Sequence, residues 1–269
     1  MTNLQIIILS ALQGATEFLP VSSSGHLILL SKLTAFPDQG LDMDIAVHLG
    51  SIAAVLLYFI RDIYQMAKGL ALWVLRRAAA DASARLFGLL IVGTLPAVIF
   101  GLILHSYGME WLRDTRIIGW NILCFGLLLG WADRHFAAVR NLEQMRVKDA
   151  LLIGLAQCLA LIPGTSRSGI TITASRMLKI KRREAAKFCM LLSIPAIAGA
   201  ALLVIWELFQ NGDFSHLSDL GCGAAYSFVA SMLAIFVMMN WLKNYTFLPF
   251  VVYRVLLGSL LLLHTYGVF

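Results

Sequence analysis

The chain has 269 residues, of which 59% are hydrophobic and 13% charged, and its mean hydropathy is +0.81. A soluble domain of this length exposes far more charge, so the composition excludes that class and indicates a polytopic α-helical membrane protein. The net charge of +6 suggests nucleic acid as one partner, but the placement of the basic residues along the chain gives it a topological cause instead.

Six apolar segments approach the roughly 17–20 residues that are needed to cross a bilayer. In chain order they are 45–60, 86–104, 117–132, 188–206, 220–242 and 247–263. Two other apolar stretches are each broken by a proline into arms too short to span. These arms are 4–19 and 27–36 around Pro20, and 149–162 and 170–178 around Pro163. Such a break is tolerated at membrane depth only where protein or a watery cavity satisfies the freed backbone groups, so each pair predicts a re-entrant helical hairpin.

The two hairpins align with each other at a constant offset. Gln13 matches Gln157, and Ser22-Ser23-Ser24-Gly25 matches Ser166-Arg167-Ser168-Gly169. Each hairpin is followed by three spans, and because three is odd the second copy enters from the opposite side. The sequence therefore predicts one integral membrane domain, 1–269, built as an inverted-topology repeat of about 1–140 and about 145–269, with a binding site where the broken helices meet.

The basic residues indicate the orientation. Most of the 21 lysine and arginine residues fall on one side of the predicted spans, and only Lys32, Arg113 and Arg116 fall on the other. The positive-inside rule makes the basic side cytoplasmic, so both termini and the first hairpin are expected to face outward. The excess of positive charge then reflects topology and anionic lipid rather than nucleic acid.

Polar and ionisable residues gather at the turn of the first hairpin. They are Gln13, Glu17, Ser22, Ser23, Ser24, Gly25 and His26. Gln13 and Glu17 lie four residues apart and share a helix face. Serines in front of a helix can cap its free N–H groups, and glycine lets backbone or ligand approach closely. Ionisable groups at membrane depth are costly, so Glu17 and His26 are candidates for function.

The second hairpin places Ser166, Arg167 and Ser168 in front of a helix that has Thr171 in its first turn. Two helix N-termini, hydroxyl donors and an arginine at one depth predict an anion site, for which phosphate is the natural ligand. The alternatives are that the small hydroxyl residues only pack, and that a Glu17–Arg167 ion pair only locks the hairpins together.

Four further polar residues fall inside apolar segments. Gln13 and Gln157 are equally compatible with a hydrogen bond across helices, and His48 is interpreted as a polar packing residue near a helix end. Arg254, in "FVVYRVLLG", is expected to extend to the cytoplasmic surface or to have a structural role. The alternative is that Arg254 lends its charge to the second hairpin.

The chain resembles the undecaprenyl pyrophosphate phosphatases of the bacitracin-resistance type, which are integral membrane enzymes of bacterial envelope lipid recycling. "QGATEFLPVSSSGH" is similar to that family's first signature, in which glutamate or glutamine precedes a second glutamate by four positions and a serine-rich turn with histidine follows. "PGTSRSGITIT" is similar to the second signature, and the resemblance spans essentially the whole chain. It implies an active site formed by Glu17, Ser23, His26 and Arg167, with Ser24, Ser166 and Thr171 nearby.

The resemblance implies hydrolysis of undecaprenyl diphosphate to undecaprenyl phosphate and inorganic phosphate, which recycles the lipid carrier of peptidoglycan synthesis and confers bacitracin resistance. It implies a place in the bacterial cytoplasmic (inner) membrane, with the site on the periplasmic or outer side. The partners expected are the lipid substrate and membrane lipid, without nucleic acid, and the oligomeric state, including a homodimer, stays open. A divalent cation, Mg²⁺ or Ca²⁺, is expected, with Glu17 as candidate ligand; Gln13 supplies one carboxylate fewer than a glutamate there.

The preferred mechanism has Ser23 attack phosphorus, His26 take its proton, and Glu17 orient His26 or hold the cation. Two variants stay open, a phosphohistidine on His26 and direct attack by water. The rival function is a transporter or flippase for polyprenyl phosphate, because inverted repeats with broken helices are typical of transporters. The grouping of Ser23, His26 and Glu17 favours an enzyme, since a passive anion site needs no base.

Overall fold

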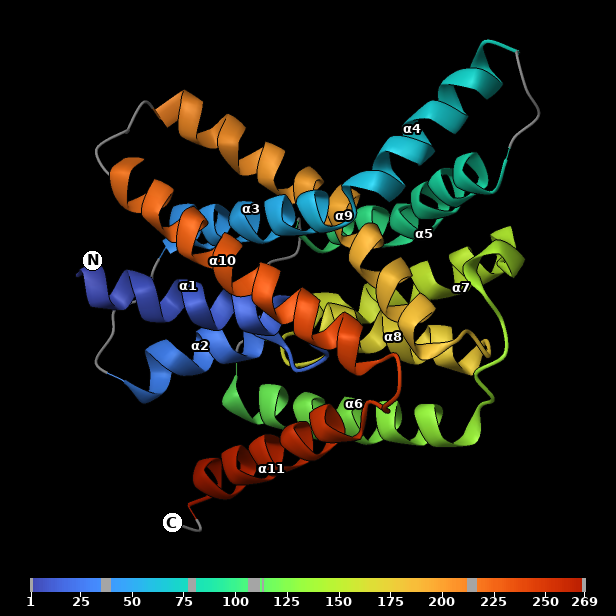
Figure 1. Cartoon of the computed structure of the whole chain (residues 1–269). Coiled ribbons are helices and arrows are strands. Elements are labelled where there is room, and N and C mark those ends of the chain that lie inside the picture. The colour runs from blue at the N-terminus through green and yellow to red at the C-terminus, as the bar shows by residue number, and fades with distance from the viewer. Residues whose placement is uncertain are drawn as a thin grey trace.

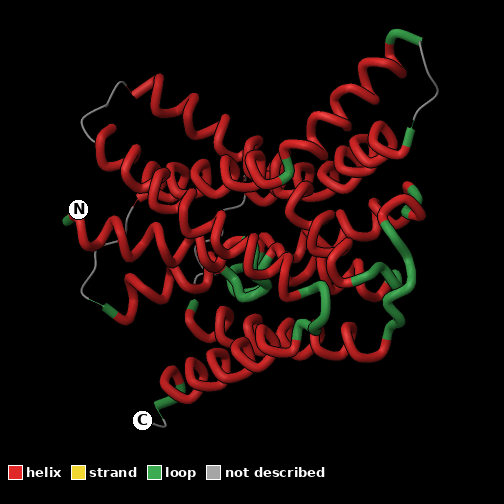
Figure 2. Tube along the Cα trace, viewed as in Figure 1, coloured by secondary structure: helices red, strands yellow, loops and turns green. Residues whose placement is uncertain are grey.

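Helices form the regular structure of the computed structural model, which describes residues 2–34, 40–76, 81–105, 112, 114–211 and 217–267 (Figure 2). Within these ranges the structure describes the backbone but not the side chains of residues 32, 33, 105, 200, 201 and 203–211. The elements are α1 (Asn3–Glu17), α2 (Ser23–Leu33), α3 (Gly40–Tyr58), α4 (Ile60–Val74), α5 (Ala82–His105), α6 (Thr115–His135), η2 (Leu142–Gln144), α7 (Val147–Gln157), η3 (Cys158–Leu161), α8 (Arg167–Met177), α9 (Arg182–Asn211), α10 (Leu217–Trp241) and α11 (Leu248–Thr265).

Among the described residues, five helices are long and apolar enough to cross a membrane, namely α3, α5, α6, α10 and α11. They contain five of the predicted spans, apart from a difference of a few residues at the ends. The chain is therefore an all-helical, multi-pass membrane protein. The sixth predicted span, 188–206, lies within α9 and overlaps side chains outside the described set, so it stays a prediction.

Helix α4 is an element that the apolar segments did not predict. The first predicted span is 45–60, but α3 ends at Tyr58 and a new helix, α4, starts at Ile60. Its two faces differ, since Met66 and Gly69 are buried whereas Tyr64 is exposed. The charged residues within α4 kept this segment outside the search for spans, although its periodicity is that of an amphipathic helix.

The two proline-broken stretches each form a pair of short helices, α1 with α2 and α7 with α8. In Figure 1, α1 and α2 run inward from the side on which both termini lie, and α7 and α8 run inward from the opposite side. Their turns touch, because the Ser168 hydroxyl donates to the Leu19 carbonyl at 2.9 Å. Four helix ends therefore meet inside the protein.

The two turns share one backbone geometry. Ser22 and Ser166 precede α2 and α8 with φ of 78° and 72°, a region that residues other than glycine rarely adopt. The Ser22 hydroxyl accepts from the Gly25 N–H at 3.3 Å, and the Ser166 hydroxyl accepts from the Gly169 N–H at 3.0 Å. Strained backbone of this kind is held only where its surroundings determine it, and it gathers at functional sites. The inverted repeat stays a prediction that this match supports.

Each hairpin is held by a helix from the other half of the chain. Helix α1 packs on α10, and α7 packs on α5. Both contacts depend on glycine, because a Cβ at Gly14 would collide with the backbone of Ser227 and a Cβ at Gly154 would collide with that of Gly93. The interlocked halves fix the two turns relative to each other.

Arg254 does not extend to the surface, so that expectation is wrong, and the structural role is confirmed. Its side chain is fully buried. The guanidinium donates to five backbone carbonyls, those of Pro20, Asn121, Ile122, Gly164 and Thr165, at 3.0–3.4 Å. Since Pro20 belongs to the first turn and Gly164 and Thr165 to the second, Arg254 ties the two turns together from α11.

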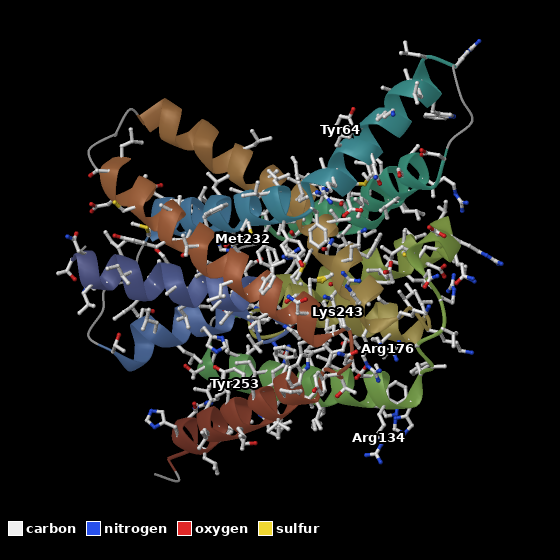
Figure 3. All side chains as sticks on the ribbon, viewed as in Figure 1. Tyr64, Arg134, Arg176, Met232, Lys243 and Tyr253 are labelled. Atoms are coloured by element: carbon white, nitrogen blue, oxygen red, sulfur yellow. The ribbon has the colours of Figure 1, made fainter. Side chains whose placement is uncertain are left out.

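Arg176 is a second buried arginine, although the sequence placed it among the basic residues of the cytoplasmic side. Its Nε donates to Asp133 Oδ1 at 2.8 Å, and Arg182 donates to the same oxygen at 2.8 Å. Figure 3 shows Arg176 within the bundle and Arg134 extending from α6. Asp133 thus links α6 to α8 and α9. The end of α8 that lies away from the two turns is therefore fixed to its neighbours as well.

Candidate active site

A cavity of about 790 Å³ opens at the meeting point of the two turns. Its polar wall is formed by Glu17, Ser23, Ser24, Asp44, His48, Gln157, Ser166, Arg167 and Ser168. The apolar wall comes from α3, α5, η3 and α9 and includes Leu41, Ile45, Ala97, Val98, Leu102, Leu161 and Ile197. A polar end beside a larger apolar space suits a ligand that has a charged head and a hydrocarbon chain.

Glu17 is the centre of the polar wall. Its Oε1 accepts from Arg167 Nη2 at 2.9 Å. Its Oε2 accepts from the Ser23 hydroxyl at 2.6 Å and from Gln13 Nε2 at 3.0 Å. His48 Nε2 lies 3.6 Å from the same oxygen. A buried carboxylate is stable only with such partners, and its position at the last residue of α1 brings it to the start of both α2 and α8.

Arg167 has one committed and one available guanidinium nitrogen. While Nη2 holds Glu17, Nη1 is buried without a hydrogen-bond partner. Arg167 is also the first residue of α8, whose N-terminal N–H groups carry partial positive charge. An anion at this place would satisfy Nη1 and the helix end together. The Glu17–Arg167 ion pair is therefore present, but it leaves Nη1 of Arg167 available to a ligand.

The predicted contact between His26 and Ser23 is not formed. His26 Nδ1 lies 2.7 Å from the Ser22 carbonyl, which can only accept, so Nδ1 carries the hydrogen. Nε2 lies 2.5 Å from the hydroxyl of Tyr253, a residue of α11 that Figure 3 labels, and the two rings stack with their planes at 9°. Both ring nitrogens are engaged away from the cavity. Glu17 bonds Ser23 directly and does not orient His26.

The remaining predicted residues fall into two groups. The cavity wall brings together Glu17, Ser23, Ser24, Ser166, Arg167 and Ser168. Those outside the wall are Gln13, Ser22, Gly25, His26 and Thr171. Gln13 supports Glu17 from behind, and the Thr171 hydroxyl donates to the Arg167 carbonyl at 2.8 Å. These contacts support Glu17 and the first residue of α8.

Three polar residues of the wall, Asp44, His48 and Gln157, were not among the predicted site residues. His48 faces the cavity rather than only packing, and its Nδ1 lies 2.6 Å from the Asp44 carbonyl. Gln157 is buried, and its Oε1 has no hydrogen-bond partner. The sequence carried a signal for His48, because Asp44 and His48 lie four residues apart on one face of an apolar span.

The donor atoms around Glu17 fit a divalent cation only in part. Glu17 supplies a carboxylate, His48 an imidazole nitrogen, and Gln13 an amide oxygen that is buried without a partner. Within the described ranges, no cluster of three or more His, Cys, Asp and Glu side chains has the geometry to hold a metal. Hard cations need six or more ligands, so a cation here requires phosphate or water oxygens as well.

The fold and the site define a multi-pass helical membrane protein with a partly polar cavity where two helix N-termini meet a buried carboxylate–guanidinium pair. Comparison of sequences adds the lineage. The chain belongs to the bacitracin resistance protein BacA family, whose sequence model matches residues 6–260.

Three relatives illustrate the similarity. The chain is 48% identical over 268 residues to the undecaprenyl-diphosphatase of Roseobacter denitrificans, an alignment that covers 99% of this chain and all of that protein. It is 49% identical over 273 residues to undecaprenyl-diphosphatase 1 of Rhodospirillum rubrum, with coverage of 99% and 96%. It is 46% identical over 264 residues to the undecaprenyl-diphosphatase of Alteromonas mediterranea, with coverage of 97% and 98%.

Proposed function

We propose that this protein is an undecaprenyl-diphosphate phosphatase, which hydrolyses the lipid diphosphate to undecaprenyl phosphate and inorganic phosphate. In this role it recycles the carrier lipid of peptidoglycan synthesis and confers resistance to bacitracin. The observation that carries the proposal is the free Nη1 of Arg167 beside the Ser23–Glu17 hydrogen bond in one cavity. Membership of the BacA family and the names of the relatives supply the substrate.

The cavity suits the two parts of that substrate. Its polar wall offers the Arg167 guanidinium, the serine hydroxyls and two helix N-termini to a diphosphate. Its apolar wall accommodates the first isoprene units, since about 790 Å³ is within the usual range of ligand sites. The rest of a long polyprenyl chain can stay in lipid, so the protein needs no pocket for it.

The hydrogen bond between Ser23 and Glu17 favours a serine nucleophile with a carboxylate base. Ser23 Oγ attacks the terminal phosphorus while its proton passes to Glu17 Oε2, the atom it already contacts. The bond from that phosphorus to the bridging oxygen breaks, and the lipid monophosphate leaves with the electron pair. Glu17 passes this proton to the departing lipid monophosphate and is again a carboxylate. Water then attacks the phosphoserine and gives one proton to Glu17, the bond from phosphorus to Ser23 Oγ breaks, Glu17 returns that proton to Ser23 Oγ, and hydrogen phosphate leaves.

Arg167 supplies the charge stabilisation that phosphoryl transfer mostly requires. Nη1 and the first N–H groups of α2 and α8 face the phosphoryl oxygens, whose charge is spread in the transition state. A bound divalent cation would supply further neutralisation of the diphosphate, with Glu17 as its carboxylate ligand. Direct attack by water is the variant that uses the same Glu17 as base without a phosphoserine.

The direct test is phosphate release from undecaprenyl diphosphate by the purified protein in detergent, with and without a chelator. We expect release by the wild type and its loss in Ser23→Ala. Ser31→Ala is the matched control, because Ser31 lies in the same helix α2 but outside the cavity wall, and its hydroxyl donates to the Ile28 carbonyl at 3.1 Å. Transport of polyprenyl phosphate without phosphate release would replace the hydrolase by the transporter.

The finer topology is also a proposal, with six spans, two re-entrant hairpins, both termini outside and the site open to the periplasmic or outer side. The opposite entry of the two hairpins in Figure 1 supports it, as does the bias of lysine and arginine along the sequence. The acidic residues Asp38 and Asp213 of the predicted outer loops lie outside the described residues.

Cysteine labelling in intact cells tests this orientation. In a background without the four native cysteines, cysteines at the exposed positions Asp42 or Asp114 should react with an impermeant thiol reagent. Cysteines at the exposed positions Arg76 or Lys148 should react only after the membrane is opened. The reverse pattern would invert the topology and leave the hydrolase proposal unchanged.

A further inference from the structure

We propose that His48 is a cation ligand of this site, acting with Glu17, so that the cation lies between His48 Nε2 and Glu17 Oε2. The inference rests on the proposed function, because diphosphate oxygens would complete the coordination. It goes beyond that function by naming a nitrogen ligand and, with it, the class of metal ion that the site prefers.

The orientation of His48 is the first step. Its Nδ1 lies 2.6 Å from the Asp44 carbonyl, an atom that only accepts, so the hydrogen of the neutral ring sits on Nδ1. The lone pair is then on Nε2, which faces Glu17 Oε2 at 3.6 Å in the cavity wall. A ring fixed by a hydrogen bond from its other nitrogen to a carbonyl is the usual arrangement of a metal-bound histidine.

The spacing is the second step. A lone pair pointing toward a carboxylate oxygen is unfavourable unless a proton or a metal cation lies between them, and the cavity leaves room for the cation. Two ligand atoms that share one ion at about 2.1 Å from each are roughly 3.0–3.4 Å apart. The pair in the structure is 3.6 Å apart, so it needs to close by only a few tenths of an ångström.

The neighbours of Glu17 Oε2 are the third step. Ser23 and Gln13 now donate to this oxygen, but a hydroxyl and an amide can each present an oxygen instead. Gln13 Oε1 is buried without a hydrogen-bond partner. A rotation of the amide that directs Oε1 toward the cation therefore breaks no hydrogen bond of Oε1. Arg167 contacts the other carboxylate oxygen, Oε1, and leaves Oε2 accessible to the cation.

The ligand set determines the preference among metals. Glu17 and His48 supply one oxygen and one nitrogen, and the described residues offer no cluster of three carboxylate, imidazole or thiol ligands. The affinity of the site for a metal ion should therefore be weak without a diphosphate. It should rise when a diphosphate or its phosphonate analogue supplies further oxygen ligands. An imidazole nitrogen favours first-row transition ions such as Mn²⁺ and Co²⁺ over Ca²⁺, which prefers oxygen.

The test is electron spin resonance of Mn²⁺ bound to the purified full chain in detergent, in the presence of a farnesyl methylenebisphosphonate as non-hydrolysable diphosphate. Electron spin-echo modulation detects nitrogen bound directly to Mn²⁺. We expect ¹⁴N modulation in the wild type, its replacement by the ¹⁵N pattern after ¹⁵N-histidine labelling, and its loss in His48→Gln. His48→Gln should also weaken Mn²⁺ binding roughly tenfold or more.

His26→Gln is the matched control, because the ring nitrogens of His26 contact Ser22 and Tyr253 and not the proposed cation. The Mn²⁺ complex of this variant should therefore keep the ¹⁴N modulation of the wild type. Absence of nitrogen coupling in the wild-type complex, failure to bind Mn²⁺, or coupling that survives His48→Gln overturns the proposal. The ¹⁵N-histidine measurement is made on the wild type, so it tests the proposal even if His48→Gln folds poorly. Phosphate release assayed in parallel separates this failure from failure of the proposed function.

Discussion

The turns before α2 and α8 have nearly the same backbone but opposite chemistry. Each begins with a serine at positive φ, and that serine caps a glycine N–H three residues later. The first residue of the helix is Ser23 in one turn and Arg167 in the other. The residue that precedes the turn is Glu17 in the first hairpin, and the aligned position in the second is Leu161.

Under the proposed mechanism, this difference divides one reaction between two turns of matching backbone geometry. Both turns offer a helix N-terminus to an anion, which is the shared part. In the proposed mechanism the first turn adds Ser23 as nucleophile and Glu17 as base, and the second adds Arg167 as the cation that binds the phosphate. Arg254 donates to carbonyls of both turns, so it holds together the two partial sites that the chemistry needs.

The largest effect should come from removing the carboxylate of the first turn. Glu17→Gln keeps the shape of the side chain but takes away the proton acceptor of Ser23 and the charge that holds Arg167. We expect turnover to fall about 10²–10⁴-fold, the range for a general base, as measured by phosphate release. Ser23→Ala should be similar, and the double variant little worse, because residues that act as a unit are not additive.

Leu161→Gln is the control for this comparison, because Leu161 is the aligned residue of the second hairpin and also lines the cavity. A polar amide there should reduce turnover far less than Glu17→Gln does. If the two variants lose equal activity, the division of chemistry between the turns is wrong.

The fold could be predicted from the sequence because its signals are local. Proline after an apolar arm predicts a broken helix, and the matched serine–glycine motifs predict equivalent turns, which the positive φ at Ser22 and Ser166 bears out in their geometry. Glu17 and Arg167 could be paired because each is too costly to bury alone. Helix α4 was missed because its charges hide an amphipathic face from a search for apolar runs.

The side of the helix on which a histidine lies could not be predicted in the same way. His26 stands in the serine motif, but its ring is turned to Tyr253, a residue 227 positions away in sequence. His48 stands in an apolar span, yet it faces Glu17. Both outcomes depend on contacts between distant segments, and the sequence position of a side chain does not specify them.

The second largest effect should come from the shared support of both turns. Arg254→Lys keeps the positive charge, but a shorter ammonium with three donors cannot reach all five carbonyls that Arg254 bonds. Leaving two or more buried carbonyls unpaired should lower the free energy of unfolding by about 3 kcal/mol or more.

Thermal unfolding in detergent measures this loss, and phosphate release should fall with it because both turns shift. Arg134→Lys is the matched control, since Arg134 is exposed on α6. Unchanged stability of Arg254→Lys would mean that the two turns hold their geometry without the shared arginine.

A smaller effect is expected when Arg167, in the second turn, loses its planar guanidinium group. Arg167→Lys can still pair with Glu17, but it lacks a second nitrogen in the place of Nη1 for the diphosphate. We expect turnover to fall at least about tenfold, the equivalent of one charge-assisted hydrogen bond, in the phosphate-release assay. Turnover close to that of the wild type would leave Arg167 as a lock between the hairpins and nothing more.

The smallest effect concerns the residue that holds His26 away from the cavity. Tyr253→Phe removes the hydroxyl at His26 Nε2 and keeps the aromatic stacking. The loss of one neutral hydrogen bond should lower the free energy of unfolding by about 0.5–1.5 kcal/mol and turnover by less than about tenfold. Because His26 takes no proton from Ser23 in this geometry, freeing its Nε2 should leave the pH profile of phosphate release unchanged. A new acid limb in that profile, or ³²P trapped on His26 rather than on Ser23, would restore His26 to the chemistry and make the Ser23–Glu17 bond a resting arrangement.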